Sequence, residues 1–285
     1  MHRCLHVFVL ITLLVSSTML TAAAYDATPG ATPTGSDSLL AELGYPEIRV
    51  TTDGTTHDLP TELEAGRYHV VFANQSNLDI DLGFLQLPEG VTFDEAMAAR
   101  ESAEVVFNGG LYTNAGETKG VVLDLIPGAW YANLFMFDPA TNEDTDTQIA
   151  ITVTGEMPEI EDPTGHVEIG LVDMDFVVPD SFEAGPQIWH ITNQGQELHH
   201  LALDRVPEGM TEDQLISYYY GPSATPGVAA TPGELALSYE DIQPVFFGIP
   251  LSPGTFNLIE LDLEPGTYVL SSGIMLGMVE VVTVE

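Results

Sequence analysis

Few residues of this chain could carry covalent or metal chemistry, and their types exclude several classes of function. The 285 residues include one cysteine, Cys4, together with eight histidines and 43 acidic residues. Cys4 lies in a segment that we expect to be removed, which would leave no disulfide, thiolate nucleophile or cysteine-ligated metal. The sequence also lacks G-x-S-x-G, H-E-x-x-H and P-loop motifs. It therefore offers no signature of hydrolytic or nucleotide chemistry.

Two local patterns that resemble functional motifs have simpler structural explanations. The run from Asp138 to Asp146 offers oxygen ligands for calcium, but it lacks the central glycine and terminal glutamate of an EF-hand loop. We predict an acidic, solvated hairpin loop there. Asn74-Gln75-Ser76 is a formal glycosylation sequon. The same Asn-Gln pair recurs 119 positions later as Asn193-Gln194-Gly195, which is not a sequon. A turn at the end of a strand explains both occurrences better.

The charge of the chain restricts its partners. Six basic residues against 43 acidic ones give a formal net charge of −37. Binding to nucleic acid requires basic contacts to phosphate, so we exclude it. Lys119 is the sole lysine, and we expect no anionic membrane surface as a partner. Adaptation to high salt and adaptation to acidic surroundings both remain open as causes of the acidity.

The first residues are typical of export rather than of a folded element. Residues 1–24 combine Arg3, an apolar stretch and an Ala-Ala-Ala end, which predicts a secretory signal peptide. We therefore expect a secreted or otherwise extracytoplasmic protein, at the cell surface or in the periplasm. Residues 25–44 form a linker rich in Ala, Thr, Pro and Gly, followed by a short helix over Ser38–Leu43 that Gly44 closes.

An internal duplication organises the rest of the chain. Glu64-Ala65-Gly66 recurs as Glu183-Ala184-Gly185, a shift of 119 positions, and many other blocks recur at the same shift. Leu123–Gly128 recurs as Leu261–Gly266, shifted by 138, so the second copy carries an insertion, which we place largely in the loop at 221–234. We predict a first domain over 45–156, a linker over 157–165 and a second domain over 166–285.

Each copy is expected to be a Greek-key β-sandwich with one short inserted helix, which makes the protein all-β. Alternating and β-branched segments such as Arg67–Asn74 and Gln148–Val153 predict strands separated by Gly, Pro and Asn. The helices are indicated by the capping-box patterns at Thr92–Glu95 and Thr211–Gln214.

The second copy resembles the cupredoxins, the plastocyanin- and azurin-like blue copper superfamily, here as a secreted tandem-domain protein with a degenerate copper site. Four segments carry this resemblance: Phe182–Gly185, Trp189–Asn193 with the following His199, Leu261–Tyr268 and Leu276–Val279. They span nearly all of 166–285, and the first copy follows the same frame.

The resemblance implies a copper site of two histidines, one cysteine thiolate and a weak methionine. It assigns His199 as the first histidine and Met278 as the methionine. Ser271-Ser272 stands where the cysteine belongs, and the loop that would supply the second histidine is shortened to Gly273-Ile274-Met275. A hydroxyl cannot replace the thiolate, so we expect no type 1 copper centre.

Two functional hypotheses follow. The first is an exported, non-enzymatic cupredoxin-like protein without cofactor that acts as a binding or interaction module for a protein or small ligand. The alternative is an extracytoplasmic copper-binding protein that holds Cu(I) with His199, Met278 and Met275, since imidazole and thioether suit that ion. Multicopper oxidases and nitrite reductases also use tandem cupredoxin folds, but this sequence lacks their H-x-H pairs and Cys-His path. On that ground we expect no oxidase.

Overall fold

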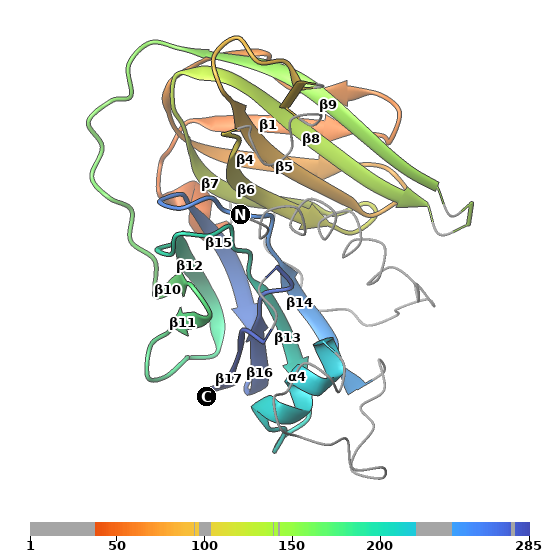
Figure 1. Ribbon diagram of the computed structural model, residues 1–285, viewed down its shortest axis with the longest axis vertical. Coiled ribbons are helices and arrows are strands. Elements are labelled where there is room, and N and C mark those ends of the chain that lie inside the picture. The colour runs from red at the N-terminus through yellow and green to blue at the C-terminus, as the bar shows by residue number, and fades with distance from the viewer. Residues whose placement is uncertain are drawn as a thin grey trace.

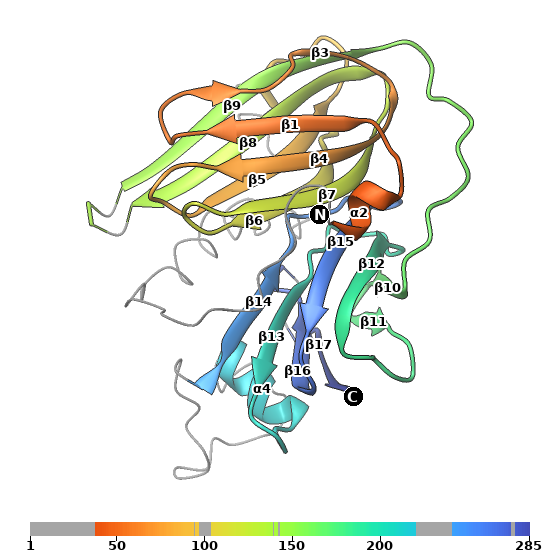
Figure 2. The same cartoon turned by 180° about the vertical axis from the view of Figure 1, so that it is seen from behind.

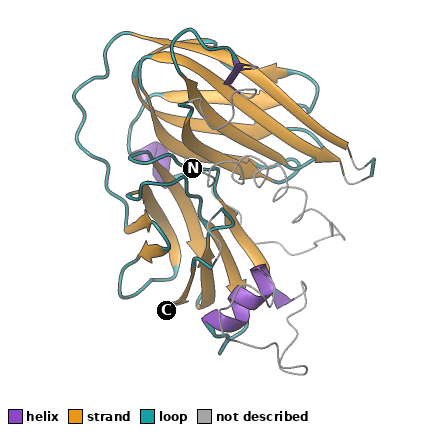
Figure 3. Ribbon diagram, in the orientation of Figure 1, coloured by secondary structure: helices purple, strands orange, loops and turns teal. Residues whose placement is uncertain are grey.

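The computed structural model describes residues 38–93, 95–96, 104–138, 140–141, 143–220, 241–274 and 277–285. These residues form an eight-stranded, a five-stranded and a four-stranded sheet (Figures 1 and 3). The prediction of an all-β protein built from packed sheets is thereby confirmed. We call the residues before the connecting segment 155–166 the first half and those after it the second half.

The first half is a sandwich of two sheets (Figure 2). One layer has the strand order β7-β4-β1-β2 and the other has the order β3-β9-β8-β5-β6. Buried apolar residues such as Phe72 and Trp130 belong to the main hydrophobic core. The strands are β1 Glu47–Thr52, β2 His57–Asp58, β3 Glu62–Glu64, β4 Gly66–Asn74, β5 Ile80–Leu87, β6 Val106–Thr113, β7 Thr118–Leu125, β8 Gly128–Asp138 and β9 Glu143–Thr154.

The second half repeats much of this arrangement. Its strands β11-β10-β12-β15 continue the eight-stranded sheet, and β14-β13-β16-β17 form the opposite layer. The elements are β10 Val167–Val172, β11 Asp175–Val177, β12 Gly185–Asn193, β13 Ala202–Val206, α4 Glu212–Tyr220, β14 Gln243–Phe247, β15 Phe256–Leu263, β16 Gly266–Ser271 and β17 Val279–Val284.

Equivalent strands have equivalent neighbours in the two halves. Strand β4 lies between parallel β1 and antiparallel β7, and β12 lies between parallel β10 and antiparallel β15. The Trp130 indole donates to the carbonyl of Ile126 at 2.8 Å, and the Tyr268 hydroxyl donates to the carbonyl of Glu264 at 2.8 Å. Both pairs are separated by four residues and lie 138 positions apart, as the sequence repeat predicts for equivalent sites.

The two halves share one sheet, which the sequence did not predict. Strand β15 pairs with β7 through Leu258 opposite Val122 and Ile259 opposite Val121. Helix α2, Leu39–Glu42, packs over this seam, because Leu40 lies in a buried cluster with Val122, Ile188 and Leu258. The predicted short helix is present, with Ser38 as its N-cap and Gly44 at a φ of 74° beyond its end.

The local predictions have several outcomes. Thr92 and Glu95 make the reciprocal bonds of a capping box, as do Thr211 and Gln214 at the start of α4. The acidic loop is shorter than expected, because β8 and β9 pair as far as Asp138 and Glu143. The predicted signal peptide, the linker up to residue 37 and the insertion loop at 221–234 lie outside the described residues. No helix within the described residues has the length and apolar character needed to cross a membrane.

Candidate metal centre

His199 lies in an isolated β-bridge shortly before β13 and is fully buried. Its backbone is fixed by a two-bond bridge to Leu251: the His199 N–H donates to the Leu251 carbonyl at 3.1 Å, and the reverse bond is 2.7 Å. Leu201 and Leu203, which follow at alternate positions, belong to the main core. The imidazole therefore lies on the same core-facing side of this segment as Leu201 and Leu203, as strand alternation predicts.

Asp173 holds one nitrogen of this imidazole. Its Oδ1 lies 3.1 Å from His199 Nε2, and it also accepts the backbone N–H groups of Gln196 at 2.9 Å and Glu197 at 3.2 Å. The hydrogen bond from His199, followed by that from Gln196, lowers the pKa of Asp173. A carboxylate only accepts, so Nε2 carries the proton and Nδ1 presents its lone pair. Nδ1 is buried and has no hydrogen-bond partner among the described residues.

The loop between β12 and His199 is shaped to permit this contact. Asn193 Oδ1 accepts the Gly195 N–H at 2.9 Å, and its amide donates to the carbonyls of Glu197 and Leu251 at 2.9 and 2.7 Å. A Cβ on Gly195 would lie 2.4 Å from Asp173 Oδ1 and 3.0 Å from His199 Nε2. Only glycine leaves room for the pair.

The sheet register brings Met278 to the same end of the second half. Ser271, the last residue of β16, pairs with Ala202 of β13 and with Val279 of β17. The next residue, Ser272, donates its N–H to the Met278 carbonyl at 3.2 Å, and the Met278 side chain is buried in the main core. Met275 lies outside the described residues.

These donors do not fit a type 1 copper centre, because Ser271 and Ser272 offer hydroxyls where the thiolate is required. Nor do the described residues contain a group of three or more His, Cys, Asp or Glu side chains that could hold a metal ion. Imidazole nitrogen and thioether sulfur are instead donors that suit a soft ion such as Cu(I) or Ag(I).

The neighbouring His200 does not join this site. It is buried against Phe247, with ring centroids 5.1 Å apart. Burial lowers the pKa of His200 to about 4. His200 is therefore neutral at ordinary pH, and successive side chains on an extended segment point in opposite directions.

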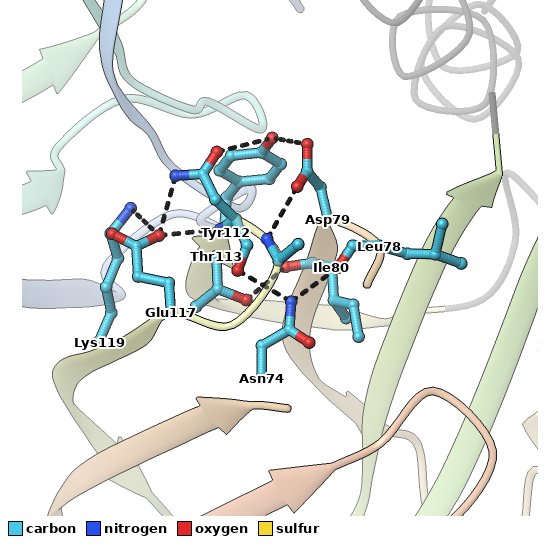
Figure 4. A network of polar contacts seen from close by, with 10 residues as sticks. Asn74, Leu78, Asp79, Ile80, Tyr112, Thr113, Glu117 and Lys119 are labelled. Carbon is cyan, nitrogen blue, oxygen red and sulfur yellow. Dashed lines mark hydrogen bonds and ion pairs between the residues drawn. The ribbon is translucent and has the colours of Figure 1, made fainter. Parts of the chain in front are cut away.

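The corresponding end of the first half is closed by a polar network without any imidazole (Figure 4). Asp79 accepts the Tyr112 hydroxyl at 2.7 Å and the Ala115 N–H at 2.9 Å, while Glu117 pairs with Lys119 at 3.0 Å. Burial, together with the charge of Asp79, raises the pKa of Tyr112 and keeps it protonated.

The counterpart of His199 in that half is Ile80, which is plain core. The turn at Asn74 is built like that at Asn193, since Asn74 Oδ1 accepts the Ser76 N–H at 3.0 Å and its amide donates to the Leu78 carbonyl at 2.8 Å. The prediction of a strand-end turn in both copies is confirmed. At this strand position the second half thus carries an imidazole and the first half an apolar side chain.

Sequence reasoning missed Asp173. It lies in the turn between β10 and β11, 26 positions before His199, in a chain with 43 acidic residues. No local pattern distinguishes it from the other carboxylates. Gly195 could have been singled out only as part of the Asn-Gln-Gly turn.

Comparison with known proteins gives structural similarity without sequence relatives. No protein-family model matches the chain, and no curated protein matches it. The reduced auracyanin of the photosynthetic bacterium Roseiflexus castenholzii is 19% identical and covers 41% of this chain and 94% of its own, with a TM-score of 0.28. A multicopper oxidase from Campylobacter jejuni is 10% identical and covers 85% and 64%, with a TM-score of 0.26.

A copper-containing nitrite reductase from Thermus scotoductus SA-01 is also similar, at 10% identity over 84% of this chain and 61% of its own, with a TM-score of 0.23. The prediction of a non-enzymatic protein is wrong on this finding, because the structurally similar proteins include enzymes. These similarities concern the fold alone, and the three sheets make the described chain all-β.

Proposed function

We propose that this chain is an exported, cupredoxin-like protein that binds a soft monovalent metal ion at His199 in place of a type 1 copper centre. The observation that carries the proposal is the state of the His199 imidazole. It is fully buried, Asp173 holds its Nε2 proton, and its Nδ1 lone pair has no partner among the described residues. A carboxylate that fixes the far nitrogen of a histidine is a common support for metal-binding imidazoles.

The donor set favours Cu(I) or Ag(I) over harder ions. His199 offers a neutral nitrogen, and Met278 and Met275 would offer thioether sulfurs. The net charge of −37 adds a long-range attraction that raises the local concentration of any cation. Export through residues 1–24 and the division into domains at 45–156 and 166–285 are parts of the same proposal, supported by the signal-like composition and by the internal repeat.

The test is a titration of the mature protein, residues 25–285, with Ag(I), and with Cu(I) under anaerobic conditions. We expect one tight site whose affinity falls by 10-fold or more in His199→Gln and in Met278→Leu. His190→Gln is the matched histidine control, because both ring nitrogens of His190 are engaged, by Glu168 at 2.6 Å and Thr192 at 3.2 Å. Met210→Leu is the matched control for a buried methionine outside the site.

Affinity that is unchanged in His199→Gln would overturn the proposal, whatever the other variants do. Loss in His199→Gln with no change in Met278→Leu would remove Met278 from the site. Equal losses in His199→Gln and His190→Gln would indicate coordination that is not specific to His199 and would also overturn the proposal.

A second candidate is an interaction module for a protein or small-ligand partner. It is favoured by the β10–β11 turn beside Asp173, where Met174 and Val177 expose more than half of their surface. Met174 also holds a φ of 70°, the sole positive value at a non-glycine residue in the described chain. Chemical-shift mapping with extracytoplasmic extract fractions would test it, and shifts away from 173–177 would contradict it.

A further inference from the structure

The end of the second half that carries His199 is covered by the first half. In Figures 1 and 2 the strand ends of β14 and β15 lie near β6 and β7. The segment 248–255, between β14 and β15, runs through this boundary. The candidate metal centre therefore borders the contact between the halves.

Two backbone hydrogen bonds and one side-chain hydrogen bond join this segment to β6. Gly109 donates its N–H to the Pro250 carbonyl at 3.0 Å. Phe107 donates its N–H to the Ser252 hydroxyl at 2.9 Å, and Ser252 returns its own N–H to the Phe107 carbonyl at 2.8 Å. The two backbone–backbone bonds flank Asn108 and Leu251, which gives the contact the character of a strand pairing.

Asn257 adds a side-chain clamp on the same stretch. Its Oδ1 accepts the Gly110 N–H at 3.0 Å, and its amide donates to the Asn108 carbonyl at 3.1 Å. The side chain is buried, and a Cβ on Gly109 would lie 2.0 Å from its Oδ1. Gly109 also has a φ of 72°, so glycine is required there for two reasons.

Leu251 connects this contact to His199. It forms one β-bridge with His199 and another with Asn108 of β6. Its carbonyl also accepts the Asn193 amide, which holds the loop before His199. A continuous backbone ladder thus runs from the candidate ligand, through Leu251, into the first half.

We propose that metal binding at His199 and the packing of the two halves stabilise each other through this ladder. The inference rests on the proposed function. When the ladder opens locally, His199 loses the bridge that fixes its backbone, so an ion bound to the imidazole favours the closed state. Such coupling is reciprocal: a change that favours the open ladder must lower the affinity of the site for the ion by the same coupling factor.

The test is amide hydrogen exchange, measured by NMR on the mature protein with and without Ag(I). We expect exchange at Phe107, Gly109 and Gly110 to slow by up to about 100-fold when free Ag(I) is 100 times its dissociation constant. The Thr152 amide, which donates to the Thr61 carbonyl at the far β3–β9 edge, is the internal control and is expected to keep its rate.

Asn257→Ala provides the reciprocal arm. It removes both bonds of the clamp without touching His199, and we expect it to reduce Ag(I) affinity and the Ag(I)-dependent protection of Gly109 together. If the variant does not fold, the exchange data on the unaltered protein decide alone.

The outcomes separate the two proposals. Absence of a His199-dependent Ag(I) site defeats the proposed function and this inference with it. Tight, His199-dependent binding with unchanged exchange at Phe107, Gly109 and Gly110 overturns the coupling and leaves the proposed function standing. Equal slowing at Thr152 also overturns it, since the ion would then stabilise the whole fold rather than the ladder.

Discussion

Arg67 is expected to contribute far more to stability than Arg205, although the two have the same kinds of contact. Arg67 donates to both oxygens of Asp124, at 2.7 and 3.0 Å, and to the Glu161 carbonyl at 2.7 Å. Arg205 donates to Glu264 at 2.7 Å and to the Pro265 carbonyl at 2.9 Å. Substitution of each by Met removes the charge and keeps most of the aliphatic stem.

The difference comes from burial. Only 4% of the Arg67 side chain is exposed, against 34% of Arg205, and the partner carboxylates are 23% and 73% exposed. Removing one partner of a buried ion pair costs about 3–5 kcal/mol, and the partial exposure of Asp124 favours about 3 kcal/mol for Arg67→Met. A solvent-exposed pair contributes about 0–1 kcal/mol, which is the expected cost of Arg205→Met.

Urea unfolding of the mature protein measures both values from the midpoint and slope of each curve. Fluorescence reports on each half, because the two tryptophans, Trp130 and Trp189, lie one in each. Arg67 also lies over the Phe256 ring of the second half, 5.0 Å from its centroid, so both probes are expected to shift together in Arg67→Met. Equal losses in the two variants, or a loss below about 1 kcal/mol in Arg67→Met, would refute the reasoning.

Three further predictions follow from single contacts. Burial raises the pKa of Asp81 from 3.8 to about 7, so its ionisation destabilises the fold as pH rises through that range. Asp81→Asn is therefore expected to raise the free energy of unfolding by up to about 4 kcal/mol at pH 8 and to leave it unchanged below about pH 4. A gain in urea unfolding that does not depend on pH would contradict this. Gly109→Ala is expected to displace Asn257 and to abolish protection of nearby amides in hydrogen exchange, whereas unchanged exchange would show that the clamp is dispensable. Trp130→Phe leaves the Ile126 carbonyl without its 2.8 Å donor and is expected to cost about 1–3 kcal/mol; a midpoint identical to that of the unaltered protein would rule this out.

The internal repeat could be detected in the sequence because equivalent positions make equivalent hydrogen bonds even where the side chains differ. Tyr68 donates its hydroxyl to the Glu64 carbonyl, and 119 positions later Gln187 donates its amide to the Glu183 carbonyl. The recurring Glu-Ala-Gly blocks mark these turns. Local patterns of this kind, with the strand alternation and the capping boxes, were sufficient to predict an all-β fold.

The contacts that build the candidate site were beyond such patterns. Alternation groups His69 and Val71 on one face of β4, but it does not say what covers that face, and both are buried. The cover near His69 includes Leu40 of helix α2, as the space beside Gly120 shows. Likewise, Asp173 meets His199 only because β10 lies beside β12, a pairing that depends on the whole sheet rather than on neighbouring residues.

The pairing of β7 with β15 has a consequence for how the protein can be handled. Two residue pairs close what would otherwise be the open edge of each half, and an open edge offers unpaired backbone groups to other chains. Either half expressed alone would present such an edge, with the apolar residues Val121 and Val122 or Leu258 and Ile259 along it. We therefore expect separated halves to self-associate, and the two to be obtained in soluble form only when they are produced together.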